Sequence, residues 1–339
     1  MSLINRQWVL NNRPTGAVAP DDLTLTQSPV RALADGEILV RNIYLSLDPT
    51  NRLWMSDREQ YLPPVQIGDV MRGGTIGVVE ESRSRRFAVG DIVMPGDAGW
   101  QLYTVTHENV TRRVRTTPGV PMTAYMSVLG GTGMTAYFGL LDICTPRPGE
   151  TLVVSAAAGA VGSVVGQIAR IKGARAIGIA GGTAKCHWLT DELGFDAAID
   201  YKNEDVGAAL DRLCPDGVDM NFENVGGPIM DAVFSRMALH GRMALCGMIS
   251  GYNVEGPLAG PTDFGRVLMK RLSIRGFIVI DYFPRAREAI ADLTQWIADG
   301  RLRWKDHVVQ GLEHAPSALE RLFAGDHDGK LMVAISPEP

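Results

Sequence analysis

The sequence lacks the features that would place this chain in a membrane, on a nucleic acid or in the export pathway. No run of about eighteen apolar residues occurs, so no membrane-spanning helix is expected. The formal net charge of −5 argues against a nucleic-acid partner. Residues 1–12 lack the basic and then apolar pattern of an export signal, and we expect a cytoplasmic protein.

The chain also has few cysteines and none in a metal-binding pattern. The four cysteines, Cys144, Cys186, Cys214 and Cys246, are far apart, and no C-x-x-C pair occurs. This spacing argues against both a zinc site and a disulfide framework. We therefore expect small core residues, with Cys186, in a polar stretch, as the one candidate for exposure.

What the sequence does contain is a strand, a turn of small residues and a helix between Thr151 and Lys172. Leu152-Val-Val154 is typical of a buried parallel strand, and the apolar residues after Val161 recur at helical spacing. Gly159 would let the backbone approach a pyrophosphate, and Gly162 would let helix and strand pack closely. The N–H groups at the start of such a helix bind phosphate, so the stretch predicts a dinucleotide site.

The fingerprint is imperfect, because Ala157 occupies the place of its usual first glycine. The pattern reads A-x-x-G-x-x-G from Ala156 to Gly162. Small residues occur at any tight strand–helix turn, so a turn without a ligand stays open as an alternative.

The texture of the chain predicts an α/β protein of about two domains. Residues 1–127 contain short strands punctuated by glycine and proline, as in a small β-barrel that shapes a substrate site. Residues 128–303 alternate strands and helices, which indicates βαβ units and a parallel sheet. Residues 304–339 return to the first texture, and we expect them to fold back onto the N-terminal domain.

The end of the second strand of the predicted parallel sheet indicates which dinucleotide to expect. An NAD site would carry an acidic residue about twenty positions after the glycines, to bind the ribose 2′-hydroxyl. Here the sequence is Gly181-Gly-Thr-Ala-Lys185, without a carboxylate. The small turn, Thr183 and Lys185 suit a 2′-phosphate, and Tyr201 could close over it. We therefore expect NADP(H), although Lys185 as a plain surface lysine remains the alternative.

Seen together, several stretches show that the chain resembles the zinc-independent medium-chain dehydrogenase/reductase superfamily, in its prostaglandin and curcumin (alkenal double-bond) reductase group. The matching stretches are Tyr44-Leu-Ser-Leu-Asp-Pro49, Gly133-Met-Thr-Ala-Tyr-Phe-Gly-Leu-Leu141, Ala156-Ala-Ala-Gly-Ala-Val-Gly162, Glu223-Asn-Val-Gly-Gly227, Cys246-Gly-Met-Ile-Ser-Gly-Tyr-Asn253 and Gly325-Asp-His-Asp-Gly-Lys330. They cover nearly the whole chain.

The resemblance implies a GroES-like β-barrel domain, a Rossmann domain and a cleft between them. It implies NADPH-dependent reduction of the C=C bond of an α,β-unsaturated ketone or aldehyde, and a homodimer joined through the Rossmann domains. The segment Ile274–Ile280 is the candidate joining strand, with a buried core strand as its alternative. Zinc-dependent relatives have ligands where this chain has Ser46-Leu-Asp48 and Gly73-Gly-Thr75, so we expect no catalytic zinc.

The resemblance also implies the site residues. Tyr252 would be the catalytic hydroxyl that stabilises the enolate, helped by the nicotinamide ribose hydroxyl. The implied coenzyme-binding residues are Met134, Thr135, Ala158, Gly159, Ala160, Val161, Gly162, Gly181, Thr183, Lys185, Tyr201, Asn224, Cys246, Gly247, Ile249, Tyr252, Phe277, Val279, His327 and Gly329. Thr50, Trp54 and Tyr61 are the candidates for substrate binding.

Two departures and two alternative functions remain. His327 stands where the family commonly has asparagine, and Thr50 stands where it commonly has tyrosine, which would widen the substrate mouth. Lys330 is a weaker candidate that could be a surface residue, and Tyr252 could be a packing residue.

A quinone reductase and a non-catalytic NADP(H)-binding sensor or structural protein are the competing functions.

Overall fold

The computed structural model describes residues 3–339, which form two units. The first unit contains the described residues up to Met126 together with Asp306–Pro339, and the second is Ser127–Lys305. Each unit has its own sheet, so the architecture is a mainly antiparallel β domain and a parallel-sheet α/β domain. Among residues 3–339, no helix is long and apolar enough to cross a bilayer.

The first unit is built on a seven-stranded sheet, with β1 and β2 pairing separately. The sheet order is β14-β15-β3-β4-β5-β7, and β6 pairs with β3. The elements are β1 Ile4–Leu10, β2 Leu23–Pro29, β3 Glu37–Ser46, α1 Thr50–Trp54, β4 Thr75–Ser82, β5 Ile92–Pro95, β6 Tyr103–His107, the short helix η1 Glu108–Val110, β7 Thr111–Arg113, η2 Met122–Tyr125, β14 Asp306–Gln310, η7 Leu312–His314, α9 Ala315–Ala324 and β15 Lys330–Ala334.

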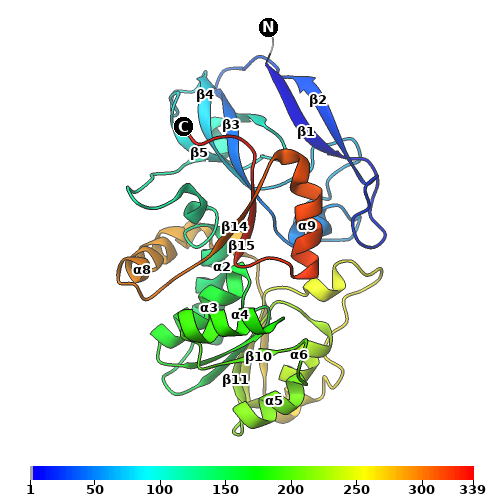
Figure 1. Ribbon diagram of the computed structural model, residues 1–339, viewed down its shortest axis with the longest axis vertical. Coiled ribbons are helices and arrows are strands. Elements are labelled where there is room, and N and C mark those ends of the chain that lie inside the picture. The colour runs from blue at the N-terminus through cyan, green and yellow to red at the C-terminus, as the bar shows by residue number, and fades with distance from the viewer. Residues whose placement is uncertain (1–2) are drawn as a thin grey trace. The chain divides into compact units, whose positions relative to one another are not determined.

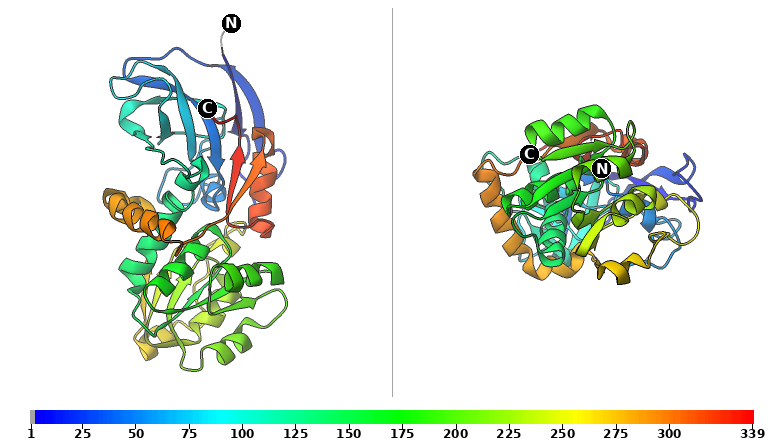
Figure 2. Two further views of the ribbon diagram at one scale, coloured as in Figure 1. Left: turned by 60° about the vertical axis from the view of Figure 1, so that its left-hand side comes forward. Right: turned by 90° about the horizontal axis from the view of Figure 1, so that it is seen from below.

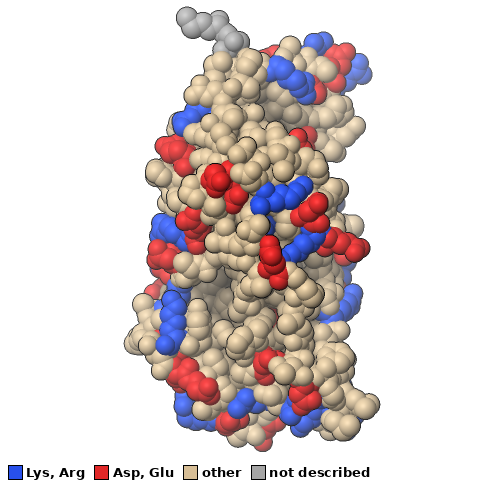
Figure 3. All heavy atoms as spheres, turned by 90° about the vertical axis from the view of Figure 1, so that its right-hand side faces the viewer, with Lys and Arg blue, Asp and Glu red and all other residues tan. Residues whose placement is uncertain are grey.

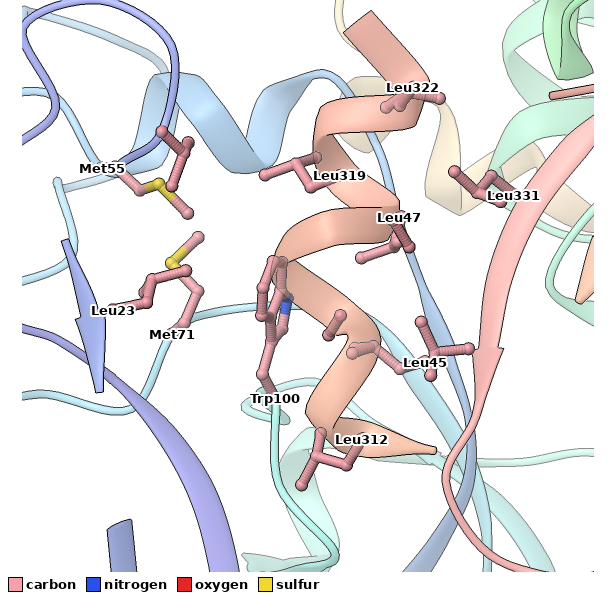
Figure 4. Close-up of a cluster of buried hydrophobic side chains, with 14 of the residues drawn as sticks. Leu23, Leu45, Leu47, Met55, Met71, Trp100, Leu312, Leu319, Leu322 and Leu331 are labelled. Carbon is pink, nitrogen blue, oxygen red and sulfur yellow. The ribbon is translucent and has the colours of Figure 1, made fainter. Parts of the chain in front are cut away.

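The C-terminal segment is part of the first unit's sheet and core. β15 pairs antiparallel with β3 and parallel with β14. The left view of Figure 2 shows α9, in red, beside these strands. In Figure 4, Leu312, Leu319 and Leu322 lie in a buried cluster with Leu45, Leu47 and Trp100. The burial of these large apolar side chains fixes the C-terminal segment to the N-terminal strands.

The second unit is a six-stranded parallel sheet with the order β10-β9-β8-β11-β12-β13. Figure 1 shows it with its helices. Its elements are α2 Gly131–Phe138, η3 Gly139–Cys144, β8 Thr151–Val154, α3 Ala160–Ile171, β9 Arg175–Ala180, α4 Thr183–His187, η4 Trp188–Glu192, β10 Ala197–Asp200, α5 Val206–Leu213, β11 Val218–Glu223, α6 Gly227–Phe234, β12 Met237–Leu245, η5 Ile249–Gly251, α7 Arg266–Lys270, β13 Ser273–Gly276, η6 Val279–Arg285 and α8 Ala286–Ala298.

The burial pattern explains why the central strands read as continuous apolar runs. Successive side chains of a strand point to opposite faces, and helices cover both faces of a parallel sheet. Val153 and Ile177 therefore pack with Leu210 of α5 and Val233 of α6. Leu152 and Val154 are fully buried as well. α3 contacts β8 and β9, and its residues Val164 and Val165 are buried.

The structure corrects or decides three of the sequence-based expectations, which concern the segment Ile274–Ile280, Cys186 and Lys330. The strand expected over Ile274–Ile280 ends at Gly276, and Val279 begins a 3-10 helix. Among the strands of residues 3–339, it is an edge strand and pairs with β12 alone. Cys186 is buried, so its polar sequence neighbourhood misled the reading of exposure. Lys330 is 3% exposed and is therefore not a surface residue.

One face of the molecule shows charged side chains of both signs. On the face shown in Figure 3, the Lys and Arg side chains are interspersed with Asp and Glu. This face has no extended basic surface of the kind that binds nucleic acids.

Candidate active site

The strand order places the site within the second unit. In the order β10-β9-β8-β11-β12-β13, successive strands are added towards one edge from β8 to β10 and towards the other edge from β11 to β13. The point between β8 and β11 is therefore the switch point of a doubly wound sheet. Ligands of such sheets bind outside the carboxyl ends of the strands at this point. The segments after β8, β9, β10, β11 and β12 therefore meet along one edge. They carry most of the residues that the sequence singled out.

The turn from β8 to α3 requires a glycine at one position for steric reasons. A Cβ on Gly162 would lie 2.5 Å from the carbonyl oxygen of Ala156 and 2.8 Å from the Cα of Ala157. A Cβ on Gly159 would meet only that same oxygen, at 3.1 Å. Ala156 itself has a φ of 49°, in the left-handed region. The backbone strain of this turn therefore falls on an alanine, one position before the place of the usual first glycine.

The start of α3 provides the anion-binding end of the turn. Gly159 is the residue before the helix, and the residues Ala160, Val161 and Gly162 form its first turn. Their N–H groups have no carbonyl partner within the helix and carry its partial positive charge. No acidic residue occupies this first turn. A cradle of small residues and N–H groups fits a diphosphate.

The turns after β9 and β10 are joined by one carboxylate. Gly182 N–H donates to Asp200 Oδ1 at 2.8 Å, and Asn203 Nδ2 donates to Oδ2 at 2.7 Å. Thr183 Oγ1 is 3.3 Å from Oδ2. The Tyr201 ring lies against Gly181, where a Cβ would be 2.8 Å from it. These contacts bring Gly181, Thr183 and Tyr201 together, and they add Asp200, which the sequence did not single out.

The ends of β8 and β11 are locked by a buried carboxylate as well. Glu223 is fully buried and accepts hydrogen bonds from Ser155 Oγ and from the N–H groups of Val225 and Gly226. Burial raises the pKa of Glu223, and these hydrogen bonds oppose that rise. Asn224 donates from its side chain to the Ser155 carbonyl at 2.7 Å. The Asn224 amide is thus held in one orientation at the switch point.

The loop after β12 folds back on the same corner. Cys246 and Gly247 donate from their backbones to the Glu223 carbonyl, and Ile249 donates to that of Asn224. Tyr252 is 8% exposed, and its hydroxyl accepts from Met248 N–H at 3.2 Å. A tyrosine hydroxyl that accepts one hydrogen bond can also donate one. Burial raises the pKa of Cys246 to about 12, which keeps this thiol protonated and unreactive.

Four further candidates of the second unit lie on α2 and after β13. Met134 is buried in α2, and Thr135 donates from its hydroxyl to the Gly131 carbonyl at 2.8 Å. The Phe277 ring packs edge-on against Phe222 of β11, with centroids 6.1 Å apart. Val279 is half-buried two residues later. The Phe277 side chain therefore belongs to an aromatic cluster, so any contact with a ligand would come from its outer edge or its backbone.

The three candidates for substrate binding lie together in the first unit. Tyr61 is 38% exposed, and the burial of the rest of its side chain raises the pKa of its hydroxyl, while the neighbouring Thr50 and Trp54 oppose the rise. The Trp54 Nε1 is buried and has no hydrogen-bond partner among the described residues. The Arg72 guanidinium lies 5.4 Å from the Trp54 ring centroid. This group combines apolar rings with polar tips, which suits a small organic ligand.

The last candidates lie where β15 begins. His327 and Gly329 belong to the turn between α9 and β15. Lys330 Nζ donates to the Leu47 carbonyl at 2.8 Å and lies 2.6 Å from Asp48 Oδ1. Ser46 donates to the other oxygen of Asp48. Asp48 and Ser46, at positions where zinc ligands would be expected in zinc-dependent relatives, are thus occupied with each other and with a buried lysine.

The donor set at these positions does not suit a zinc ion. In the part of the chain that the structure describes, no group of three or more His, Cys, Asp or Glu side chains could hold a metal. Ser46 and Lys330 supply a hydroxyl and an ammonium group around Asp48, neither of which is a zinc ligand found in proteins.

Comparison with known proteins places this architecture among characterised enzymes. Residues 6–114 match a family described as the N-terminal domain of oxidoreductase, and residues 160–299 match one described as zinc-binding dehydrogenase. The chain is 41% identical to NADPH-dependent curcumin reductase of Escherichia coli, over 98% of this chain and 97% of that one. It is 36% identical to prostaglandin reductase 1 of Bos taurus, over 97% and 98%.

A solved structure agrees closely with the fold. The structure of CurA from Vibrio vulnificus in complex with NADPH is 44% identical, with a TM-score of 0.93. The alignment covers 98% of this chain and 100% of that one. A β domain joined to a doubly wound domain with a glycine turn is the architecture of a medium-chain oxidoreductase. The chain belongs to the zinc-independent medium-chain dehydrogenases/reductases, in the group of the curcumin, alkenal and prostaglandin reductases.

Proposed function

We propose that this protein is an NADPH-dependent reductase of the C=C bond of α,β-unsaturated ketones and aldehydes. The relatives at 36–41% identity carry the names curcumin reductase, 2-alkenal reductase, pulegone reductase and prostaglandin reductase. Matches of this extent cover both units of the chain. The observation that carries the proposal is the combination of a phosphate-binding turn and a buried tyrosine hydroxyl at one sheet edge.

The coenzyme would be held by the second unit's loops. The α3 N-terminus fits the diphosphate, because Gly159 leaves room for a close approach of its oxygens. Gly181, Thr183, Lys185 and Tyr201 are assigned to the 2′-phosphorylated ribose. The remaining assignments are Ala158, Ala160, Val161 and Gly162 at the helix start, Met134 and Thr135 on α2, Asn224, Cys246, Gly247, Ile249 and Tyr252 near the switch point, Phe277 and Val279 after β13, and His327 and Gly329 of the first unit.

The chain's own residues would then stabilise developing charge. When bound, NADPH supplies the hydride that adds to the β-carbon of the enone. Negative charge builds on the substrate's carbonyl oxygen, and Tyr252 donates a hydrogen bond to it. The Met248 N–H, which donates to the Tyr252 hydroxyl, makes that hydroxyl a better donor by polarising it. Thr50, Trp54 and Tyr61 are assigned to the substrate.

The decisive experiment is NADPH oxidation against a panel of conjugated carbonyls. Straight-chain enones and alkenals should be reduced, with NADH as the control that gives much slower rates. Faster turnover of benzoquinones would instead favour a quinone reductase. Binding of NADPH without turnover of any of these compounds would favour a non-catalytic sensor or structural protein.

Our proposal includes a homodimer that forms along the edge of the second unit's sheet. β13 has a free edge for pairing, and apolar side chains near it in sequence are exposed, including Ile280 at 40% and Phe283 at 51%. An Ile280→Glu variant should weaken the dimer in sedimentation equilibrium. Val89→Glu is the control, at an apolar residue of the first unit that is 66% exposed. A monomeric wild-type protein at micromolar concentration would contradict this assignment.

The cytoplasmic location remains a prediction, which cell fractionation would test.

A further inference from the structure

The Asp200 carboxylate accepts hydrogen bonds from several donors, although it is not one of the residues assigned to the coenzyme. It ends β10, next to Ala180 at the end of β9, because the two strands pair in register. Its residue is only 9% exposed. A carboxylate this buried must have its oxygens satisfied by hydrogen-bond donors.

Four donors from two different turns converge on this one side chain. Gly182 N–H and Lys202 N–H donate to Oδ1, at 2.8 and 3.2 Å. Asn203 Nδ2 and Thr183 Oγ1 donate to Oδ2, at 2.7 and 3.3 Å. Burial opposes ionisation, yet these hydrogen bonds lower the pKa of Asp200 overall. Asp200 is thus an ionised acceptor at neutral pH.

These two turns are the ones that carry the proposed ribose-phosphate residues. The turn 181–183 opens α4, and Gly182 has a φ of 105°, which favours glycine. The turn 201–203 carries Tyr201, whose ring packs on Gly181 and whose N–H donates to the Ala180 carbonyl at 3.1 Å. With Asp200 removed, the two turns would lose their shared acceptor.

We propose that Asp200 is the positioning residue of the 2′-phosphate pocket and thereby sets the preference for NADP(H) over NAD(H). It acts through its neighbours and touches no coenzyme atom. By binding Gly182, Thr183, Lys202 and Asn203 at once, it holds Thr183 and Tyr201 in the geometry that a phosphate needs. This inference rests on the coenzyme assignment under Proposed function.

A competing effect has the opposite sign, which makes the inference testable. A carboxylate near a bound phosphate also repels it electrostatically. If repulsion dominated, Asp200→Asn would strengthen binding of the phosphorylated coenzyme. If positioning dominates, the same change weakens it, because an amide nitrogen would face donors that now have no acceptor.

The experiment compares Asp200→Asn with Asp196→Asn in the full-length protein. Asp196 precedes β10 and accepts from the Ala176 N–H at 2.8 Å, so it is a hydrogen-bonded carboxylate at the opposite end of the same strands. Unlike Asp200 it is exposed, so Asp196→Asn controls for the loss of one negative charge. Binding of adenosine 2′,5′-bisphosphate and of 5′-AMP is measured by calorimetry. KM for NADPH and NADH, and kcat at saturating NADPH, are measured in parallel.

Asp200→Asn should raise the Kd for the bisphosphate and the KM for NADPH about tenfold, equal to about 1.4 kcal/mol. Affinity for 5′-AMP and kcat at saturation should hardly change, and Asp196→Asn should leave all these quantities at their wild-type values. Tighter binding of the bisphosphate by Asp200→Asn, or unchanged binding, overturns the inference. If Asp200→Asn lowers the affinity for 5′-AMP by the same factor as the affinity for the bisphosphate, the inference is also overturned, because Asp200 then has a general structural role.

Two further arms keep the test decisive. If Asp200→Asn does not fold, Asn203→Ala replaces it, because this removes one donor from Oδ2 at an exposed residue. A several-fold rise in the Kd for the bisphosphate is then expected, and unchanged binding overturns the inference. The wild-type protein is measured first. If it does not prefer the bisphosphate to 5′-AMP, the coenzyme assignment itself is wrong, whatever the variants do.

Discussion

A single methyl group at Gly162 should separate the stability of the turn from its binding function. In Gly162→Ala the new Cβ would lie 2.5 Å from the Ala156 carbonyl oxygen and 2.8 Å from the Ala157 Cα. Both are backbone atoms, so neither can rotate away, and α3 must move relative to β8. Overpacking of this kind costs about 1–3 kcal/mol, and alanine's better helix propensity returns up to about 1 kcal/mol.

The expected net loss is therefore about 1–2 kcal/mol in the free energy of unfolding. For a domain of this size it corresponds to a fall in Tm of roughly 3–6 °C. Scanning calorimetry and urea titration followed by tryptophan fluorescence would measure it. Since the helix start moves, KM for NADPH should rise as well.

Gly159→Ala is the matched comparison in the same turn. Its Cβ would meet only the Ala156 oxygen, at 3.1 Å, and the φ of −81° suits alanine. We expect a smaller loss of stability, below about 1 kcal/mol, since alanine is a poorer N-cap than glycine. KM for NADPH should still rise, because the methyl group occupies the approach of the diphosphate. A Gly162→Ala protein with wild-type Tm, or one less perturbed than Gly159→Ala, would refute the steric argument.

Three other outcomes are expected. Tyr252→Phe should lower kcat/KM for an enone on the order of a hundredfold, because one donor to the oxyanion is lost. The Kd for NADPH should change little. Turnover at the wild-type rate would show that the hydroxyl is dispensable. Glu223→Gln should be neutral to stabilising by up to about 1 kcal/mol at neutral pH, because it removes an ionisable group from a fully buried site while its amide oxygen can keep the hydrogen bonds of Oε1. Its new Nε2 would face the Asn221 Nδ2 that now donates to Glu223 Oε2, so the Asn221 amide must turn over and present Oδ1, which has no partner among the described residues. Since burial raises the pKa of Glu223, the stability of the wild type should fall as pH rises through that pKa, and the variant should lack this fall; a strong loss of stability in thermal unfolding of the variant would contradict this. The Arg31 guanidinium lowers the pKa of Glu37 to about 2. The contribution of this ion pair to the free energy of unfolding is therefore present above about pH 5 and is lost as pH falls towards 2. Glu37→Gln should flatten this part of the acid unfolding curve, and an unchanged curve would argue that the ion pair contributes nothing to stability.

Local sequence determined the elements whose signals are themselves local. The apolar run Leu152–Val154, the small-residue turn and the amphipathic stretch after Val161 predicted β8 and α3, because burial on both faces of a parallel strand and 3.6-residue periodicity leave clear patterns. The absence of an acid after β9 was readable for the same reason. The missing zinc ligands were also visible in the residues alone.

Tertiary structure decided the features that depend on neighbouring strands. Asp200 and Glu223 looked like ordinary acidic residues, and only the parallel pairing of β10 with β9 and of β11 with β8 brings their distant donors into reach. These donors are Gly182 and Thr183 for Asp200 and Ser155 for Glu223. The burial of Lys330 followed from its distant partner Asp48. The early end of β13 and its place at the sheet edge were likewise hidden in an apolar segment. A carboxylate's role is set by which donors surround it, and for both residues some of these donors lie far away along the chain.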